Sequence, residues 1–180
     1  MGSAFLSLLF LVGMPIVISI TVGYLMMHIT GRGEPKFRQT GDPSSIPLHS
    51  RYKGYSQKEA ENYWIWLRAR DAIDTEKRFL KADLLYPFFY TGSMIASLFL
   101  AWVWLDRPFN SLVFLIPVAI MVLADWTENL MQLRELHHFV RGESLNPTSI
   151  QTASIATITK CVFLVISFLM ILGLAIWVVR

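Results

Sequence analysis

The sequence predicts an all-α integral membrane protein with four transmembrane helices and an amphipathic interfacial helix in the first cytoplasmic loop. Of the 180 residues, 54% are hydrophobic and only 16% are charged, and the mean hydropathy is +0.46. The apolar residues fall in a few long runs. Four runs have roughly the 20 residues that a helix needs to cross about 30 Å of hydrocarbon. This composition excludes a soluble enzyme, a disordered tail and a disulfide scaffold.

The four predicted crossings belong to a single membrane domain, residues 1–180, and cover residues 4–28, 83–105, 109–133 and 159–179. The first is too long for a signal core and lacks preceding basic residues, so we expect it to be retained. The second ends in Trp102 and Trp104, as an aromatic interface belt would. Asn146 and Pro147 resemble a helix start. The fourth helix is therefore predicted to begin in the cytoplasm, before it enters the bilayer.

Lysine and arginine are distributed unequally between the two sides of the predicted bundle. The first loop, residues 29–81, carries eleven of them, and three more flank the loop after the third crossing. Only Arg107 and Arg180 fall on the opposite side. The positive-inside rule then puts both termini outside and the basic loops in the cytoplasm. We expect the membrane to be a bacterial inner membrane. This distribution favours contact with an anionic inner leaflet over nucleic acid.

The first cytoplasmic loop is predicted to hold one helix after an extended stretch. Residues 31–54 are rich in Gly, Pro, Ser and charge and show no helical periodicity. Ser56 and Glu59 have capping-box spacing, so a helix begins there and helix-forming residues continue to about Leu80. Its composition suits a helix in the headgroup layer, and packing on the protein's own helices or on a partner is an equal alternative. The side chains concerned are Tyr63, Trp64, Trp66, Arg68 and Arg70.

Polar side chains recur along one face of the third crossing, at spacings of three and four residues. A rise of about 1.5 Å per residue from the outer boundary places Asp125 near the inner edge of the hydrocarbon. The same count places Asp83 of the second crossing and Lys160 of the fourth at that level. The sequence therefore predicts a polar inner-leaflet cluster made of Asp83, Asp125, Glu128, Asn129, Gln132 and Lys160.

Two interpretations of this polar cluster differ in which group balances the negative charge of its carboxylates. Unpaired acids at this depth are costly, so in the structural interpretation they bond to Lys160, Arg134 or backbone amides and hold three helices in register. The other interpretation is a hard-cation site with an added histidine ligand. Its candidate ligands are Asp83, Asp125, Glu128, His137 and His138. The sequence favours the structural interpretation, because such acid spacing is common and adjacent histidines project in different directions.

Small residues on the second crossing predict a close approach of a neighbouring helix, because short side chains let two backbones come together. The two pairs, each with members four residues apart, are Gly92 with Ala96 and Ser93 with Ser97. We expect these positions to be helix-packing sites.

A short motif in the third crossing is similar to one in a group of known sequences. Residues 125–130 read D-x-x-E-N followed by a hydrophobic residue, and residues 83–87 read DLLYP. In these features the chain resembles small uncharacterised bacterial membrane proteins with four predicted helices, over roughly residues 60–140. The resemblance implies a similar four-helix topology, and it carries no activity, cofactor or partner.

The sequence contains no familiar catalytic apparatus. It has no phosphate-binding glycine loop, nucleophile elbow, H-E-x-x-H or multi-histidine array. The single cysteine, Cys161, cannot form an internal disulfide or a cysteine metal centre. We therefore predict a non-catalytic protein that contacts membrane lipids and other integral membrane subunits, as an accessory, structural or assembly subunit of a complex such as a respiratory or photosynthetic one. No cofactor of its own is predicted, and lipid or pigment from a partner complex fits that role. The alternative is a small membrane enzyme or ion- or metal-handling protein that uses the acidic cluster.

Overall fold

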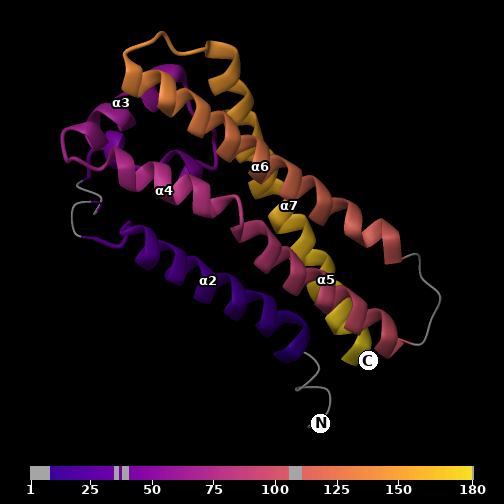
Figure 1. The fold of residues 1–180 in the computed structure, drawn as a ribbon. Coiled ribbons are helices and arrows are strands. Elements are labelled where there is room, and N and C mark those ends of the chain that lie inside the picture. Colours follow the sequence, from indigo (N-terminus) through magenta and orange to yellow (C-terminus); the bar gives the residue numbers. More distant parts are fainter. Residues whose placement is uncertain (1–8, 35–36, 38–40, 106–110, 180) are drawn as a thin grey trace.

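The computed structural model describes residues 9–34, 37, 41–105 and 111–179, and this part of the chain is helical with no strand. Within it, four helical segments are long and apolar enough to cross a membrane: Leu9–Thr30, Ile73–Trp104, Val113–Arg141 and Pro147–Val178. Figure 1 shows an elongated bundle in which the start of α2 (Met14–Thr30) and the end of α7 (Pro147–Val179) lie at one end, while α3 (Gln57–Arg68) lies at the other. This arrangement matches the even number of crossings that the sequence predicts.

The first helix follows the predicted crossing closely. A π-helical turn, η1 (Leu9–Gly13), runs into α2, and Pro15 occupies the first turn of α2, where its missing N–H is no loss. The helix ends at Thr30 because Gly31 adopts φ +80° and donates its N–H to the His28 carbonyl oxygen. A residue with a side chain would be strained in that left-handed conformation. Residues 4–8 of the predicted crossing lie outside the described residues.

The second crossing is divided into two helices. α4 (Ile73–Asp83) ends at Asp83, and α5 (Tyr86–Leu105) begins after Leu84 and Leu85. Pro87 lies in the first turn of α5, where a residue without an N–H is tolerated. The indole Nε1 of Trp126 donates to the Leu84 carbonyl oxygen at 3.0 Å and so satisfies a backbone group that the break leaves free. Residue 83, the predicted start of this crossing, is therefore the point at which the helix is interrupted.

The helix in the loop after the first predicted crossing begins as predicted and ends earlier than predicted. The Ser56 N–H donates to Glu59 Oε2 at 2.7 Å, and the Glu59 N–H donates to Ser56 Oγ at 3.3 Å, which completes the capping box of α3. α3 stops at Arg68 and does not continue to Leu80, because the chain reverses at Asp71, which has φ +50°. The preceding stretch, predicted to be extended, contains two short 3-10 helices, η3 (Pro43–Ser45) and η4 (Leu48–Ser50).

The last two helices are longer than the spans predicted for them and pack against each other. α6 covers Ser111–Arg141, and α7 begins at Pro147. The side-chain oxygen of Asn146 accepts the N–H groups of Thr148 and Ser149 at 3.0 and 3.2 Å. This cap confirms the predicted helix start at Asn146 and Pro147. α6 extends beyond its apolar run because residues with good helical propensity, such as Gln132 and Glu135, continue it, whereas the Ser- and Thr-rich start of α7 is supported by the Asn146 cap.

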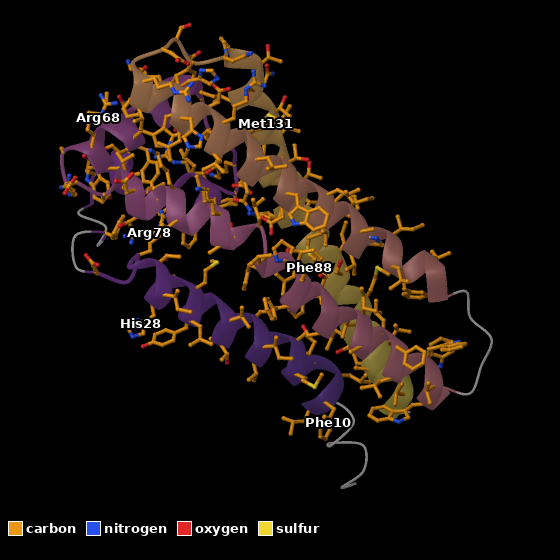
Figure 2. The ribbon with its side chains drawn as sticks, viewed as in Figure 1. Phe10, His28, Arg68, Arg78, Phe88 and Met131 are labelled. Carbon is orange, nitrogen blue, oxygen red and sulfur yellow. The ribbon has the colours of Figure 1, made fainter. Side chains whose placement is uncertain are left out.

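Buried apolar side chains form two clusters, one towards each end of the bundle. The cluster at the α3 end contains Tyr63, Trp64 and Trp66, and the first two are only 1% exposed. Arg68 lies over the Phe139 ring at 4.1 Å, and Arg70 lies over the Trp66 ring at 4.1 Å. Figure 2 shows Arg68 at this end, far from Phe10. The aromatics thus follow the packing alternative, and the expectation that they form a headgroup-layer surface is wrong for these three side chains, because α6, α7 and the preceding loop cover them.

The two pairs of small residues on α5 face different surroundings. Ser93 and Ser97 are buried, and their hydroxyls donate to the carbonyl oxygens of Tyr90 and Ser93 at 2.7 and 3.1 Å. Gly92 is exposed, and a Cβ added there would meet no atom within 4 Å. The expectation that Gly92 with Ala96 packs closely on a neighbouring helix is therefore wrong within this chain, because that face of α5 turns outward.

Candidate functional site

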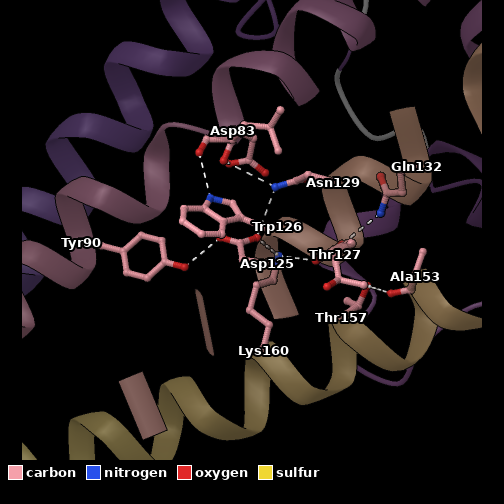
Figure 3. A network of polar contacts seen from close by, with 12 residues as sticks. Asp83, Tyr90, Asp125, Trp126, Thr127, Asn129, Gln132, Ala153, Thr157 and Lys160 are labelled. Atoms are coloured by element: carbon pink, nitrogen blue, oxygen red, sulfur yellow. Dashed lines mark hydrogen bonds and ion pairs between the residues drawn. The ribbon is translucent and has the colours of Figure 1, made fainter. Parts of the chain in front are cut away.

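Lys160 lies at the centre of the predicted polar cluster, between two acids of α6 (Figure 3). Its Nζ is 3.0 Å from Asp125 Oδ1 and 2.5 Å from Glu128 Oε2. The predicted ion pairing to Lys160 is therefore present. Arg134, the other cation considered, has an exposed side chain and lies 3.8 Å from Glu135 instead. One ammonium group of α7 thus pairs with two acids of α6.

Amide and phenol groups complete the network around these acids. The Asn129 amide donates to Asp125 Oδ1 at 3.4 Å and to the Asp83 carbonyl oxygen at 3.5 Å. The Gln132 amide donates to Glu128 Oε1 at 3.0 Å and to the Tyr55 hydroxyl at 3.0 Å. All six residues of the predicted cluster therefore lie together, at the level where α4 passes into α5.

Two tyrosines of the network were missed by the sequence analysis. The Tyr90 hydroxyl donates to Asp125 Oδ2 at 2.8 Å, and Tyr55 reaches Gln132 from the loop that precedes α3. Tyr90 lies in an apolar helix that is rich in aromatics, and Tyr55 lies in a stretch without periodicity. Neither position carries a spacing signal, so only the packing of the helices reveals the two contacts.

Asp83 differs from the other two acids of the cluster because it has no ion pair with any described residue. It is 6% exposed, so its carboxylate is largely removed from water. Within the described part of the chain, the ion pairs of Lys160 are with Asp125 and Glu128. The cluster therefore holds three carboxyl groups and one ammonium group.

A cavity of about 350 Å³ opens beside this cluster. Asp83, Asp125 and Lys160 line its polar end, and Met121, Leu164 and Phe168 line its apolar part. α2 supplies a further wall that includes Gly23 and Met27, and the Tyr86 hydroxyl ties α5 to α2 through the Ser19 carbonyl oxygen at 2.9 Å. The cavity thus has charged groups at one side and hydrocarbon at the other.

His49, in η4, also lines this cavity. Its ring stacks on Phe79 with the ring centres 5.1 Å apart. Its Nδ1 atom is buried and has no hydrogen-bond partner among the residues that the structure describes. Burial, followed by the charges of Arg32 and Lys160, lowers the pKa of His49 well below its ordinary value. The ring is therefore neutral at pH 7.

A second buried ion pair, which the sequence analysis did not identify, lies next to the cavity. Arg32 forms an ion pair with Glu76 and donates to the Tyr63 hydroxyl at 2.5 Å. Its guanidinium lies 4.3 Å from the centre of the Phe79 ring. Burial alone would lower the pKa of Arg32, but the charge of Glu76 and the hydrogen bond with Tyr63 hold it above its ordinary value. Arg32 was counted as a basic loop residue, and it is instead fixed inside the protein.

The candidate acids and histidines do not form one metal site. Across the described ranges, no three His, Cys, Asp or Glu side chains are grouped so that they could hold a metal ion. His137 and His138 line a separate surface cavity with Arg134 and Arg141, and His138 Nδ1 lies 2.5 Å from Glu143 Oε2. The proposed set of three acids with a histidine is therefore wrong as a geometric unit, because these histidines project from a different face of α6.

Comparison with known proteins adds no relative to this description. No family model, curated protein or solved structure matches the chain. The resemblance through the D-x-x-E-N segment stays a prediction, and the functional argument rests on the polar cluster and the cavity beside it.

Proposed function

We propose that this chain is a non-catalytic integral membrane protein that binds an amphipathic membrane molecule, such as a lipid, in the cavity beside Lys160. The observation that supports this proposal is the division of one cavity into an ionisable end and an apolar end. Its volume of about 350 Å³ falls within the range of about 300–1,000 Å³ that is usual for ligand pockets. A lipid-like molecule has a polar head and a hydrocarbon body, so it matches both ends.

The wider role that we propose is that of an accessory or assembly subunit of a larger complex in a bacterial inner membrane. We infer that a helix of a partner subunit packs on the outward face of α5, because Gly92 leaves space for the two backbones to approach closely. Both termini would lie outside and the α3 end in the cytoplasm, with the basic side chains of α3 near the inner headgroup layer.

The proposed orientation predicts the labelling of introduced cysteines in intact cells. In a Cys161→Ser background, a membrane-impermeant thiol reagent should modify a cysteine at Asn110 and spare one at Ser144. Ser144 is exposed, so its protection would report the membrane and not burial in the protein. After permeabilisation, position 144 should be modified as well. Modification of position 144 alone in intact cells would reverse the orientation.

The proposed cavity predicts that one glycine substitution displaces a bound molecule while another does not. A Cβ added at Gly23 would stand 3.4 Å from the Tyr86 hydroxyl, at the cavity wall, so Gly23→Leu should fill part of the cavity. Gly92→Leu makes the same change where a Cβ meets nothing within 4 Å. Native mass spectrometry after mild detergent extraction should find bound lipid on the wild type and on Gly92→Leu, and little on Gly23→Leu.

The same preparation tests the alternative function. Equal lipid on all three proteins would reject binding in this cavity. Stoichiometric metal in the wild type would favour the ion- or metal-handling protein. Comparable thermal unfolding midpoints for Gly23→Leu and Gly92→Leu would show that loss of lipid reflects a filled cavity and not a damaged fold.

A further inference from the structure

The charges around the cavity do not balance. Asp83, Asp125 and Glu128 supply three carboxyl groups, and Lys160 supplies one ammonium group that already contacts the last two. Arg32, the other buried cation nearby, forms an ion pair with Glu76 and a hydrogen bond with Tyr63. Among the described residues Asp83 therefore has no ion pair of its own, and Lys160 and Arg32 act on it only from a longer distance. Asn129 is the hydrogen-bond partner of the Asp83 side chain. A buried carboxylate without an ion pair is unfavourable, so this position favours a positive group supplied from elsewhere.

Other groups on the cavity wall suit the same occupant. His49 presents a buried Nδ1 that has no hydrogen-bond partner within the described part of the chain. Because the ring is neutral, Nδ1 can accept a hydrogen bond when the proton lies on Nε2. The rings of Tyr86 and Tyr90 also line the cavity, with their centres 5.0 Å apart, and the faces of aromatic rings attract cations.

We propose that the bound amphiphile carries an ammonium headgroup that pairs with the Asp83 carboxylate. This inference rests on the proposed function and adds the chemical class of the ligand. One N–H of the ammonium group donates to Asp83 and another donates to His49 Nδ1, while the hydrocarbon body lies against Leu164 and Phe168. An anionic headgroup would be repelled by Asp83, and a neutral one would leave it unpaired. A proton on Asp83 would also balance the charge, but it would create no preference among headgroups.

Cys161 provides the measurement, because it lines the cavity and is the single cysteine of the chain. The full chain is placed in nanodiscs of digalactosyl diacylglycerol, a neutral lipid without an ammonium group. The rate of Cys161 alkylation by N-ethylmaleimide is then measured with dodecylamine, dodecanol or dodecanoate. Ethylamine tests whether the headgroup alone is sufficient. We expect dodecylamine to slow alkylation about tenfold at about ten times its dissociation constant, and the other three compounds to have little effect.

Two matched substitutions on α4 identify the acid responsible. Asp83→Asn should abolish protection by dodecylamine, while Asp74→Asn, which removes an exposed acid from the same helix, should leave it unchanged. Because Asp83 has no ion pair to lose among the residues that the structure describes, we expect Asp83→Asn to unfold at a temperature no lower than that of the wild type. If this variant does not fold, the preference of the wild type among the three headgroups decides the proposal.

The outcomes separate the ligand class from the proposed function. Equal protection by the three dodecyl compounds would retain a cavity for amphiphiles and overturn the ammonium preference. Protection by none of them would overturn both. Protection by ethylamine as strong as that by dodecylamine would overturn the amphiphile and leave a site for small amines. Protection by dodecylamine that persists in Asp83→Asn would overturn the role of Asp83.

Discussion

Replacing Lys160 with methionine is expected to lower the free energy of unfolding by about 3–5 kcal/mol, because it leaves two buried acids without their shared cation. Asp125 and Glu128 are 2% and 0% exposed, so water cannot replace the lost ammonium group without rearrangement. For a chain of this size the thermal midpoint should fall by about 6–20 °C. Intrinsic tryptophan fluorescence during heating in a mild detergent provides the measurement.

Neutralising the acids tests whether this loss comes from the unpaired charges. Glu128→Gln alone should cost less than Lys160→Met, since Lys160 keeps Asp125 at 3.0 Å. Adding Asp125→Asn and Glu128→Gln to Lys160→Met should restore part of the lost stability, because the two acids that lost their shared cation are then neutral. A chelator should leave the wild-type midpoint unchanged. A chelator-induced loss of stability, with no rescue in the triple variant, would favour a metal site.

Trp64→Ala is expected to destabilise the protein by about 3–5 kcal/mol, the usual cost of removing a large aromatic side chain from a core. Trp64 is 1% exposed, and its ring lies 5.7 Å from that of Phe139. The neighbouring Ile65 is 51% exposed, so Ile65→Ala should change stability by less than about 0.5 kcal/mol. Thermal unfolding of the two variants measures the difference.

A different result is expected if the aromatic side chains of α3 lie in the lipid headgroup layer. Trp64→Ala would then weaken the protection of α3 by lipid vesicles while the unfolding midpoint stayed near that of the wild type. A small change in midpoint together with reduced vesicle protection would therefore contradict the packing of Trp64 in the structure.

The sequence by itself determined the features that depend on local chemistry. Each long apolar run must form its own backbone hydrogen bonds, so the four long helices follow from composition and length. The Ser56 and Glu59 cap and the start of the last helix at Asn146 were equally predictable, because a cap needs only residues close in sequence. The spacing of Asp125 and Glu128, with the length of each run, also predicted that these acids would meet Lys160.

Only the tertiary structure decided what covers each polar or aromatic face. Arg32 lies in a basic loop by sequence, yet it is buried with Glu76, which is 44 residues away. Gly92 and Ser93 are neighbours on one helix, but only the serine faces inward. The isolation of Asp83 and the open Nδ1 of His49 likewise depend on which side chains arrive from other helices. Periodicity defines a face of a helix but not its partner, because the partner is chosen by contacts between residues far apart in the chain.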